Sequence, residues 1–220
     1  MPLFSELADG ATAYTINIEI IIESENMRLF PPAAGAALLA MLFLLPLAAR
    51  AQDPGQQEIL VNYSLYYENF KNKNYADALP NLRWMLENAP AYRGDKNFER
   101  AVTAYEQMAL AEADAEIRRA LFDTALVMFD TAVPTVREAG GEIDEFEWTL
   151  DKGKFIFEHL EHLPDLEGEV ATNYRRAWEM DPEKLDSYYL EYILAHLIQN
   201  EGDKEGTVAF LDEIEEVRGV

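Results

Sequence analysis

The spacing of apolar residues between positions 74 and 90 constrains this chain more than any other feature of its sequence. Apolar side chains recur there three or four positions apart, as one face of an α-helix requires. They are Tyr75, Ala78, Leu82, Met85 and Leu86. Pro90 follows, and because proline cannot continue a helix, the pattern predicts a helix that ends before it.

The same spacing recurs later in the chain and ends at Pro182. The second set, Val170, Tyr174, Ala177 and Pro182, repeats the intervals of Ala78, Leu82, Met85 and Pro90. An alanine, an apolar residue four positions later and a closing proline resemble the second helix of a tetratricopeptide repeat. The resemblance is best over residues 57–92 and 144–181. The last helix pair supports it, and the second pair is inferred from periodicity.

This resemblance implies an all-α fold, an antiparallel helix-hairpin solenoid with a superhelical twist and about four hairpins. The hairpins are expected over residues 58–92, 93–139, 144–183 and 185–219. In such a solenoid the first helix of each hairpin would line a concave face. The resemblance therefore implies a non-enzymatic scaffold that binds a protein or peptide partner in a groove.

Capping residues, prolines and glycines predict where several helices begin and end. Asp77 is a plausible N-cap, which would place Pro80 in the first turn, where its missing N–H has no partner to lose. A later helix is expected to begin near Asp114 and to end at Pro134 and the glycine pair that follows.

A further helix is expected over residues 144–163, with Gly153 in its apolar stripe. Because glycine has no Cβ atom, a neighbouring helix can approach it closely. Gly153 is therefore interpreted as a helix crossing rather than a hinge.

The chain is strongly acidic, which limits its ligands. It has 41 acidic and 18 basic residues among 220, for a formal net charge of −23. Such a charge repels phosphate backbones and anionic lipid surfaces, so nucleic acid is not expected as a partner. Two interpretations of the acidic surface stay open, adaptation to high salt and attraction of a basic partner. Because 49% of the residues are hydrophobic, the chain can still bury a core.

Cysteine is absent from the chain. Its absence excludes disulfides, thiolate zinc sites and a cysteine nucleophile. It also excludes lipid attachment at an N-terminal cysteine.

Residues 27–51 have the layout of a secretory signal peptide. Arg28 supplies a basic start, an apolar run covers residues 33–48, and Ala-Arg-Ala at 49–51 forms a small-x-small cleavage site. The alternative is a membrane anchor, but the apolar run is at the short end for spanning a bilayer, so cleavage after Ala51 is expected instead. Cleavage would leave no stable membrane span. The acidic residues 1–26 do not suit a signal peptide and are interpreted as a miscalled N-terminal extension. The repeat domain would then cover residues 52–220, in the periplasm or secreted.

The sequence FEHLEHLPD at residues 157–165 contains the candidate metal ligands. His159 and His162 are three positions apart, on neighbouring positions of one helical turn. A third ligand would have to come from elsewhere, and the HExxH order that supplies a general base is missing. A solvated helix end is therefore expected, with a metal-dependent enzyme or metal-binding protein as the alternative. No nucleotide or nucleophile motif occurs, so neither a cofactor nor catalysis is expected.

Aromatic residues on the first helix supply the candidate groove. Carried over from the family, the groove would hold Tyr63, Tyr67, Phe70 and Lys71 of the first hairpin. Tyrosines stand where a family member that clamps a carboxylate would have Lys and Asn, so an apolar or proline-containing segment is the expected ligand. The alternative is that these tyrosines only pack helices together.

The third hairpin adds residues to the groove in one of two registers. If the register follows Pro182, Phe155 and His159 face the groove. If it follows Gly153, the groove residues are instead Leu150, Lys154 and Phe157.

Overall fold

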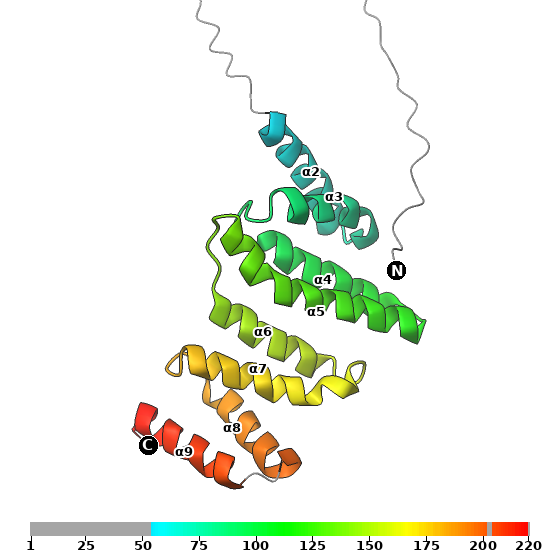
Figure 1. Cartoon of the computed structure of the whole chain (residues 1–220). Helices are drawn as coiled ribbons and strands as arrows, with labels where there is room; N and C mark the ends of the chain where they lie inside the picture. The colour runs from blue at the N-terminus through cyan, green and yellow to red at the C-terminus, as the bar shows by residue number, and fades with distance from the viewer. Residues whose placement is uncertain (1–53, 202–203, 220) are drawn as a thin grey trace, which may run out of the picture. The chain divides into compact units, whose positions relative to one another are not determined.

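The computed structural model describes residues 54–201 and 204–219, and the secondary structure of that part is entirely helical (Figure 1). The expected all-α class is therefore confirmed for these residues. The predicted signal peptide and N-terminal extension lie outside them. The helices are α2 (Pro54–Lys71), α3 (Tyr75–Asn88), α4 (Lys96–Ala111), α5 (Ala115–Glu138), α6 (Glu145–Glu158), the 3-10 turn η1 (Pro164–Leu166), α7 (Glu167–Met180), α8 (Ser187–His196), the π-helical turn η2 (Leu197–Glu201) and α9 (Lys204–Arg218).

The helices pack mainly on their neighbours in sequence. The most extensive contacts join α2 to α3, α4 to α5, and α6 to α7. Side chains also connect alternate helices, because Tyr66 of α2 contacts Asn97 of α4 and Asp95 next to α4 contacts Trp148 of α6. This arrangement is helical-repeat-like. No helix in the described part of the chain is long and apolar enough to cross a membrane.

The apolar face predicted around residues 74–90 is buried in α3. Ala78, Leu82 and Met85 are inaccessible to solvent. The matching residues of α7, among them Val170 and Tyr174, are buried as well. The periodicity therefore identified the inner faces of both helices correctly.

Aspartate caps begin several helices. The Asp114 carboxylate accepts hydrogen bonds from the backbone N–H groups of Glu116 and Ile117, so the predicted start of α5 is confirmed. The predicted cap at Asp77 is wrong, because α3 begins at Tyr75, where the ring packs edge-on against Phe70. Asp77 instead lies in the first turn, where a carboxylate is favourable near the helix N-terminus.

Pro80 and Pro134 both lie further inside their helices than the sequence predicted. Because α3 begins early, Pro80 follows its first turn, and α5 continues past Pro134 to Glu138. A Schellman motif ends α5: Gly140 N–H donates to the Arg137 carbonyl and Gly141 N–H donates to the Val136 carbonyl. Gly140 has φ +76°, which glycine adopts without steric cost.

Gly153 marks the crossing of α6 and α7, as predicted. A Cβ atom at this position would lie 2.6 Å from Cε1 of Tyr174, whose ring is buried. The ring of Tyr174 thus occupies the space that any side chain at residue 153 would need. The helix itself is shorter than expected, since α6 ends at Glu158 and His159 follows as its C-cap residue.

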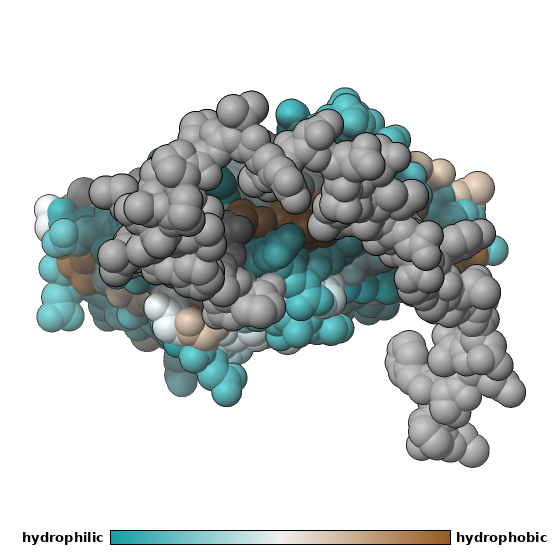
Figure 2. Space-filling model, turned by 90° about the horizontal axis from the view of Figure 1, so that it is seen from above, coloured by the Kyte–Doolittle hydropathy of each residue, from teal (hydrophilic) through white to brown (hydrophobic). Residues whose placement is uncertain are grey.

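The visible face of the molecule in Figure 2 is mostly hydrophilic, with hydrophobic residues in smaller areas between polar ones. This pattern accords with the acidic composition of the chain. Apolar side chains are nevertheless exposed on the terminal helix α2, where Leu60, Val61 and Leu65 are about half accessible. The aromatic rings of α2, in contrast, are half-buried or buried.

Candidate functional site

The structure separates the predicted groove residues into two groups. Tyr63, Tyr67 and Phe70 of α2 are half-buried. Lys71, the last residue of α2, is exposed. The two residues expected from the third hairpin, Phe155 and His159, are instead buried in the core, with exposed fractions of 6% and 7%. They are therefore not available as a contact surface, and the α2 residues remain as candidates.

Phe155 and His159 are buried because α5 covers them. The ring of Phe122 lies 6.0 Å from that of Phe155 and 4.7 Å from that of His159. Of the residues in the other register, Leu150 is also buried, while Lys154 is half-buried and Phe157 is exposed.

The tyrosines of α2 form a cluster with the segment between α3 and α4. Tyr63 and Tyr67 stack, with ring centroids 5.4 Å apart and planes inclined by 13°. Tyr92 packs edge-on against Tyr63 at 5.3 Å. Stacked and edge-on rings attract each other beyond the apolar area that they bury. The cluster therefore holds its rings in fixed positions, with one side toward solvent.

A buried polar network lies beneath these rings. The Tyr66 hydroxyl donates to Oδ1 of Asn97 at 2.5 Å, and Nδ2 of Asn97 donates to the Tyr92 carbonyl at 3.1 Å. Nη1 of Arg100 donates to the Tyr66 hydroxyl at 2.7 Å. Tyr66 and Asn97 are both inaccessible to solvent, so each bond satisfies a group that water cannot reach. The network fixes α2 and the α3–α4 turn against α4.

Two arginines lie against the tyrosine rings. The guanidinium carbon of Arg93 is 4.8 Å from the centroid of Tyr63, and that of Arg100 is 4.8 Å from the centroid of Tyr67. Arg93 occupies a left-handed conformation with φ +64°, and Gly94 follows with φ +71°. We call the surface formed by Tyr63, Tyr67, Tyr92, Arg93 and Arg100 the tyrosine face.

Sequence reasoning found Tyr63 and Tyr67 but missed Tyr92 and both arginines. Arg93 lies in a turn whose backbone no periodicity describes. Arg100 lies on a separate helix, 33 residues after Tyr67. The available signal was the scarcity of basic residues in so acidic a chain, which makes two arginines near one turn unusual.

Burial of Tyr66 predicts a loss of stability at alkaline pH. Burial raises the pKa of Tyr66 to about 12, although the hydrogen bond from Arg100 opposes this shift. The unfolded chain ionises this tyrosine near pH 10, so it releases the proton before the folded chain does. Between about pH 10 and 12, the contribution of Tyr66 to the free energy of unfolding should therefore fall by about 1.4 kcal/mol per pH unit. Urea unfolding across that range measures it.

The matched variants for this pH dependence are Tyr66→Phe and Tyr188→Phe. Tyr66→Phe should be less stable at neutral pH but should lose less stability above pH 10. Tyr188 is 52% exposed, so Tyr188→Phe should follow the wild-type curve. Equal alkaline slopes for wild type and Tyr66→Phe would contradict the assignment. Tyr174, whose pKa burial also raises, contributes a loss of the same sign in all three proteins.

The residues that could bind a metal ion are grouped differently from the prediction. His159 lies with Glu106 of α4 and Glu158, with one possible ligand atom from each residue within 4.8 Å of the others. Nε2 of His159 is 2.9 Å from Oε1 of Glu106. His162 lies outside this group and stacks on Phe122 instead. The predicted solvated helix end is wrong for His159, which is buried.

The group formed by Glu106, Glu158 and His159 has the chemistry to hold a divalent cation, because carboxylate oxygens and imidazole nitrogen are common ligands. The hydrogen bond between Glu106 and His159 already uses two of these atoms. That bond gives the buried imidazole the polar partner that burial requires. The closeness of Glu106 and His159 is thus explained by their structural hydrogen bond.

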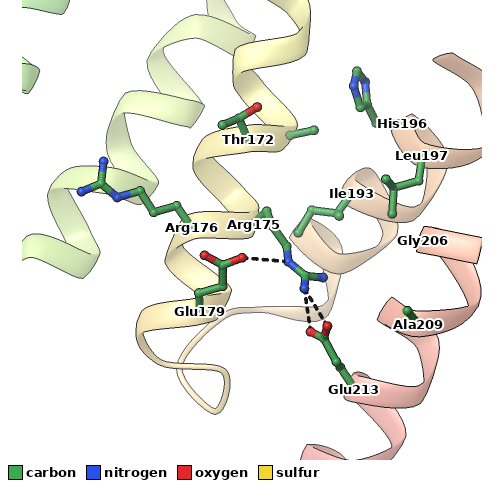
Figure 3. Close-up of a pocket in the computed structure, with 11 residues that line it drawn as sticks. Thr172, Arg175, Arg176, Glu179, Ile193, His196, Leu197, Gly206, Ala209 and Glu213 are labelled. Carbon is green, nitrogen blue, oxygen red and sulfur yellow. Dashed lines mark hydrogen bonds and ion pairs between the residues drawn. The ribbon is translucent and has the colours of Figure 1, made fainter. Parts of the chain in front are cut away.

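A pocket of about 530 Å³ lies among α7, α8 and α9 (Figure 3). Arg175 reaches across it and pairs with Glu213 at 2.7 Å and with Glu179 at 3.2 Å. Its walls include the apolar residues Ile193 and Leu197. Because Arg175 is already paired with two carboxylates, its charge is not available to a ligand.

Comparisons of this chain with models of protein families, with curated proteins and with solved structures find no match. The function is therefore argued from the arrangement of its own residues.

Proposed function

We propose that this protein is a non-enzymatic helical-repeat scaffold of the tetratricopeptide type, which binds a segment of another protein on the tyrosine face. The observation that carries the proposal is the fixed cluster of half-buried rings at Tyr63, Tyr67 and Tyr92. The four predicted hairpins and their superhelical stacking belong to the same proposal. The sequential packing of the helices supports it.

Tyrosine suits such a surface for physical reasons. Its ring contributes a large contact area, it loses little conformational entropy on binding, and its hydroxyl can still form hydrogen bonds. Here the rings are already held by one another and by the bonds of Tyr66 and Asn97 below them. A surface that is ordered before binding loses less entropy when a partner arrives. The tyrosine face therefore combines the composition and the rigidity of a binding site.

The test compares partners captured by three forms of the full chain: wild type, Tyr67→Ala and Leu211→Ala. Leu211 is an exposed apolar residue of α9, distant in sequence from the tyrosine face, and serves as the matched control. Proteins captured from the source cells and quantified by mass spectrometry should include at least one that binds wild type and Leu211→Ala equally. Tyr67→Ala should reduce its recovery about tenfold or more, as expected for an aromatic hot spot.

The folding of Tyr67→Ala decides how that result is interpreted. A half-buried ring should be removable with the fold intact, which circular dichroism and thermal melting can show. A loss of about 3 kcal/mol or more in the free energy of unfolding would make Tyr67 a core residue. That result, or identical captured proteins for all three forms, would contradict the proposed binding surface.

A further inference from the structure

Among the residues that the structure describes, the two arginines of the tyrosine face have no acidic partner, although the chain is rich in acid. The chain has 41 acidic residues and 18 basic ones. Four arginines elsewhere, Arg119, Arg137, Arg175 and Arg176, each pair with a carboxylate. Three others, Arg83, Arg118 and Arg218, donate instead to hydroxyl or carbonyl oxygens. Among the side chains described in residues 55–199 and 204–219, neither Arg93 nor Arg100 has a carboxylate within ion-pair distance. Their guanidinium groups lie over tyrosine rings instead.

The two guanidinium groups also share one ring. Arg93 lies 4.8 Å and Arg100 5.7 Å from the centroid of Tyr63. Two positive charges held near one ring repel each other, and the rings offset this only in part. An anion placed between them would be attracted by both. The arrangement thus has an unbalanced positive charge in a protein whose net charge is −23.

The geometry leaves hydrogen-bond donors available to such an anion. A guanidinium has five N–H donors around its edge, and packing its face against a ring does not use them. Arg100 uses Nη1 to reach the Tyr66 hydroxyl. Arg93 is exposed to solvent. The forked edge of a guanidinium matches a carboxylate in shape and charge.

We propose that the tyrosine face binds a peptide segment whose Asp or Glu side chains pair with Arg93 and Arg100 while its neighbouring residues contact Tyr63 and Tyr67. This inference rests on the proposed function and supplies the chemistry of its partner. It revises the expectation of a purely apolar or proline-containing ligand. It also differs from one of the two interpretations of the acidic surface, attraction of a basic partner, because the local charge of this face is opposite to that of the chain.

The net charge of the chain then contributes to selectivity. Extended polyanions are repelled by the remaining acidic surface, whereas one or two carboxylates can be held at the arginines. Other candidate sites do not offer this combination. The central arginine of the pocket among α7, α8 and α9 is already neutralised by Glu179 and Glu213.

The test is selection from a library of random heptapeptides displayed between fixed flanking sequences, so that none has a free C-terminus. The full wild-type chain should enrich peptides that contain Asp or Glu beside an apolar or aromatic residue. The best peptide, synthesised with an amidated C-terminus, should bind in calorimetry. Its Glu→Gln or Asp→Gln version should bind roughly tenfold or more weakly, as expected for the loss of a charge-assisted hydrogen bond.

Matched variants locate the contact. Arg93→Gln and Arg100→Gln should each weaken the peptide roughly tenfold or more. Arg83→Gln is the control. Arg83 also lies over a tyrosine ring and donates to its hydroxyl at 2.8 Å, but that tyrosine is Tyr105, which is not part of the tyrosine face. This variant should leave the affinity unchanged. Arg93 forms no hydrogen bond to the buried side chains of Tyr66 and Asn97, so Arg93→Gln tests the site even if Arg100→Gln unfolds the protein.

The remaining outcomes separate this inference from the proposed function. Selected peptides without acidic residues, equal binding by Arg93→Gln, or binding only through a free C-terminal carboxylate would overturn the inference. The scaffold proposal would survive these results. If no peptide binds the wild-type chain at all, both proposals fail.

Discussion

Replacing Gly153 by valine is expected to lower the free energy of unfolding by about 3 kcal/mol or more. Even the Cβ atom of this side chain would lie 2.6 Å from the Tyr174 ring, and the next contact, with Cδ1 of the same ring, would be 2.8 Å. Tyr174 is buried and cannot swing into solvent without leaving a cavity. The crossing of α6 and α7 must therefore widen. Urea denaturation monitored by circular dichroism measures the loss.

Two further glycine variants control for helix propensity. Gly153→Ala gains about 1 kcal/mol of propensity but still meets the ring, so a smaller net loss is expected. Gly168→Ala makes a similar change near the start of α7, where no atom lies within 4 Å of the new Cβ. It should leave the stability unchanged or raise it. If Gly153→Val were as stable as wild type, the close approach of α6 and α7 would be wrong.

Replacing Asn97 by alanine is expected to cost about 3 kcal/mol. The change removes the acceptor of the Tyr66 hydroxyl and the donor to the Tyr92 carbonyl at once. Buried polar groups left without a partner lose the hydration that the unfolded chain provides. Asn88→Ala is the matched control, because Asn88 is exposed and bonds only within its own helix, to the Trp84 carbonyl. It should change stability by about 0.5 kcal/mol or less.

A double-mutant cycle with Tyr66→Phe tests whether Asn97 acts through the tyrosine. Once Asn97 is absent, removing the Tyr66 hydroxyl should cost clearly less than in wild type. A coupling of about 0.5 kcal/mol or more is expected for residues in one network. Strict additivity of the two changes would show that the cost of Asn97→Ala comes from elsewhere, and the network would then not be the link between α2 and α4.

The sequence predicted those features that depend on local periodicity and on single residues. Helical spacing located the buried faces of α3 and α7, and a missing Cβ atom located the crossing at Gly153. Both signals lie within one helix, so they can be read without knowing its neighbours. The capping aspartate of α5 is equally local.

The errors arose where distant parts of the chain decide the outcome. Whether His159 is exposed depends on Phe122 of α5 and Glu106 of α4, which lie 37 and 53 residues earlier. Periodicity shows that such residues share a stripe but not which helix covers it. The start of α3 was missed for a different, local reason: the ring of Tyr75 packs on Phe70 of the preceding helix, and the capping preference of Asp77 does not reveal this contact.

The first turn of α4 has a consequence for how this protein unfolds. Asn97 connects that turn backward to Tyr66, and Asp95 connects it forward to Trp148 at 2.9 Å. In an array where each helix contacts only near neighbours, the ends open before the middle unless such connections join them. One short segment thus determines how far fraying of the N-terminal helices spreads into the rest. While both bonds are intact, the backbone amides of α2 and α3 should exchange hydrogen at the same rate as those of α4. Once the bond to Tyr66 is lost, the amides of α2 and α3 should exchange faster than those of α4.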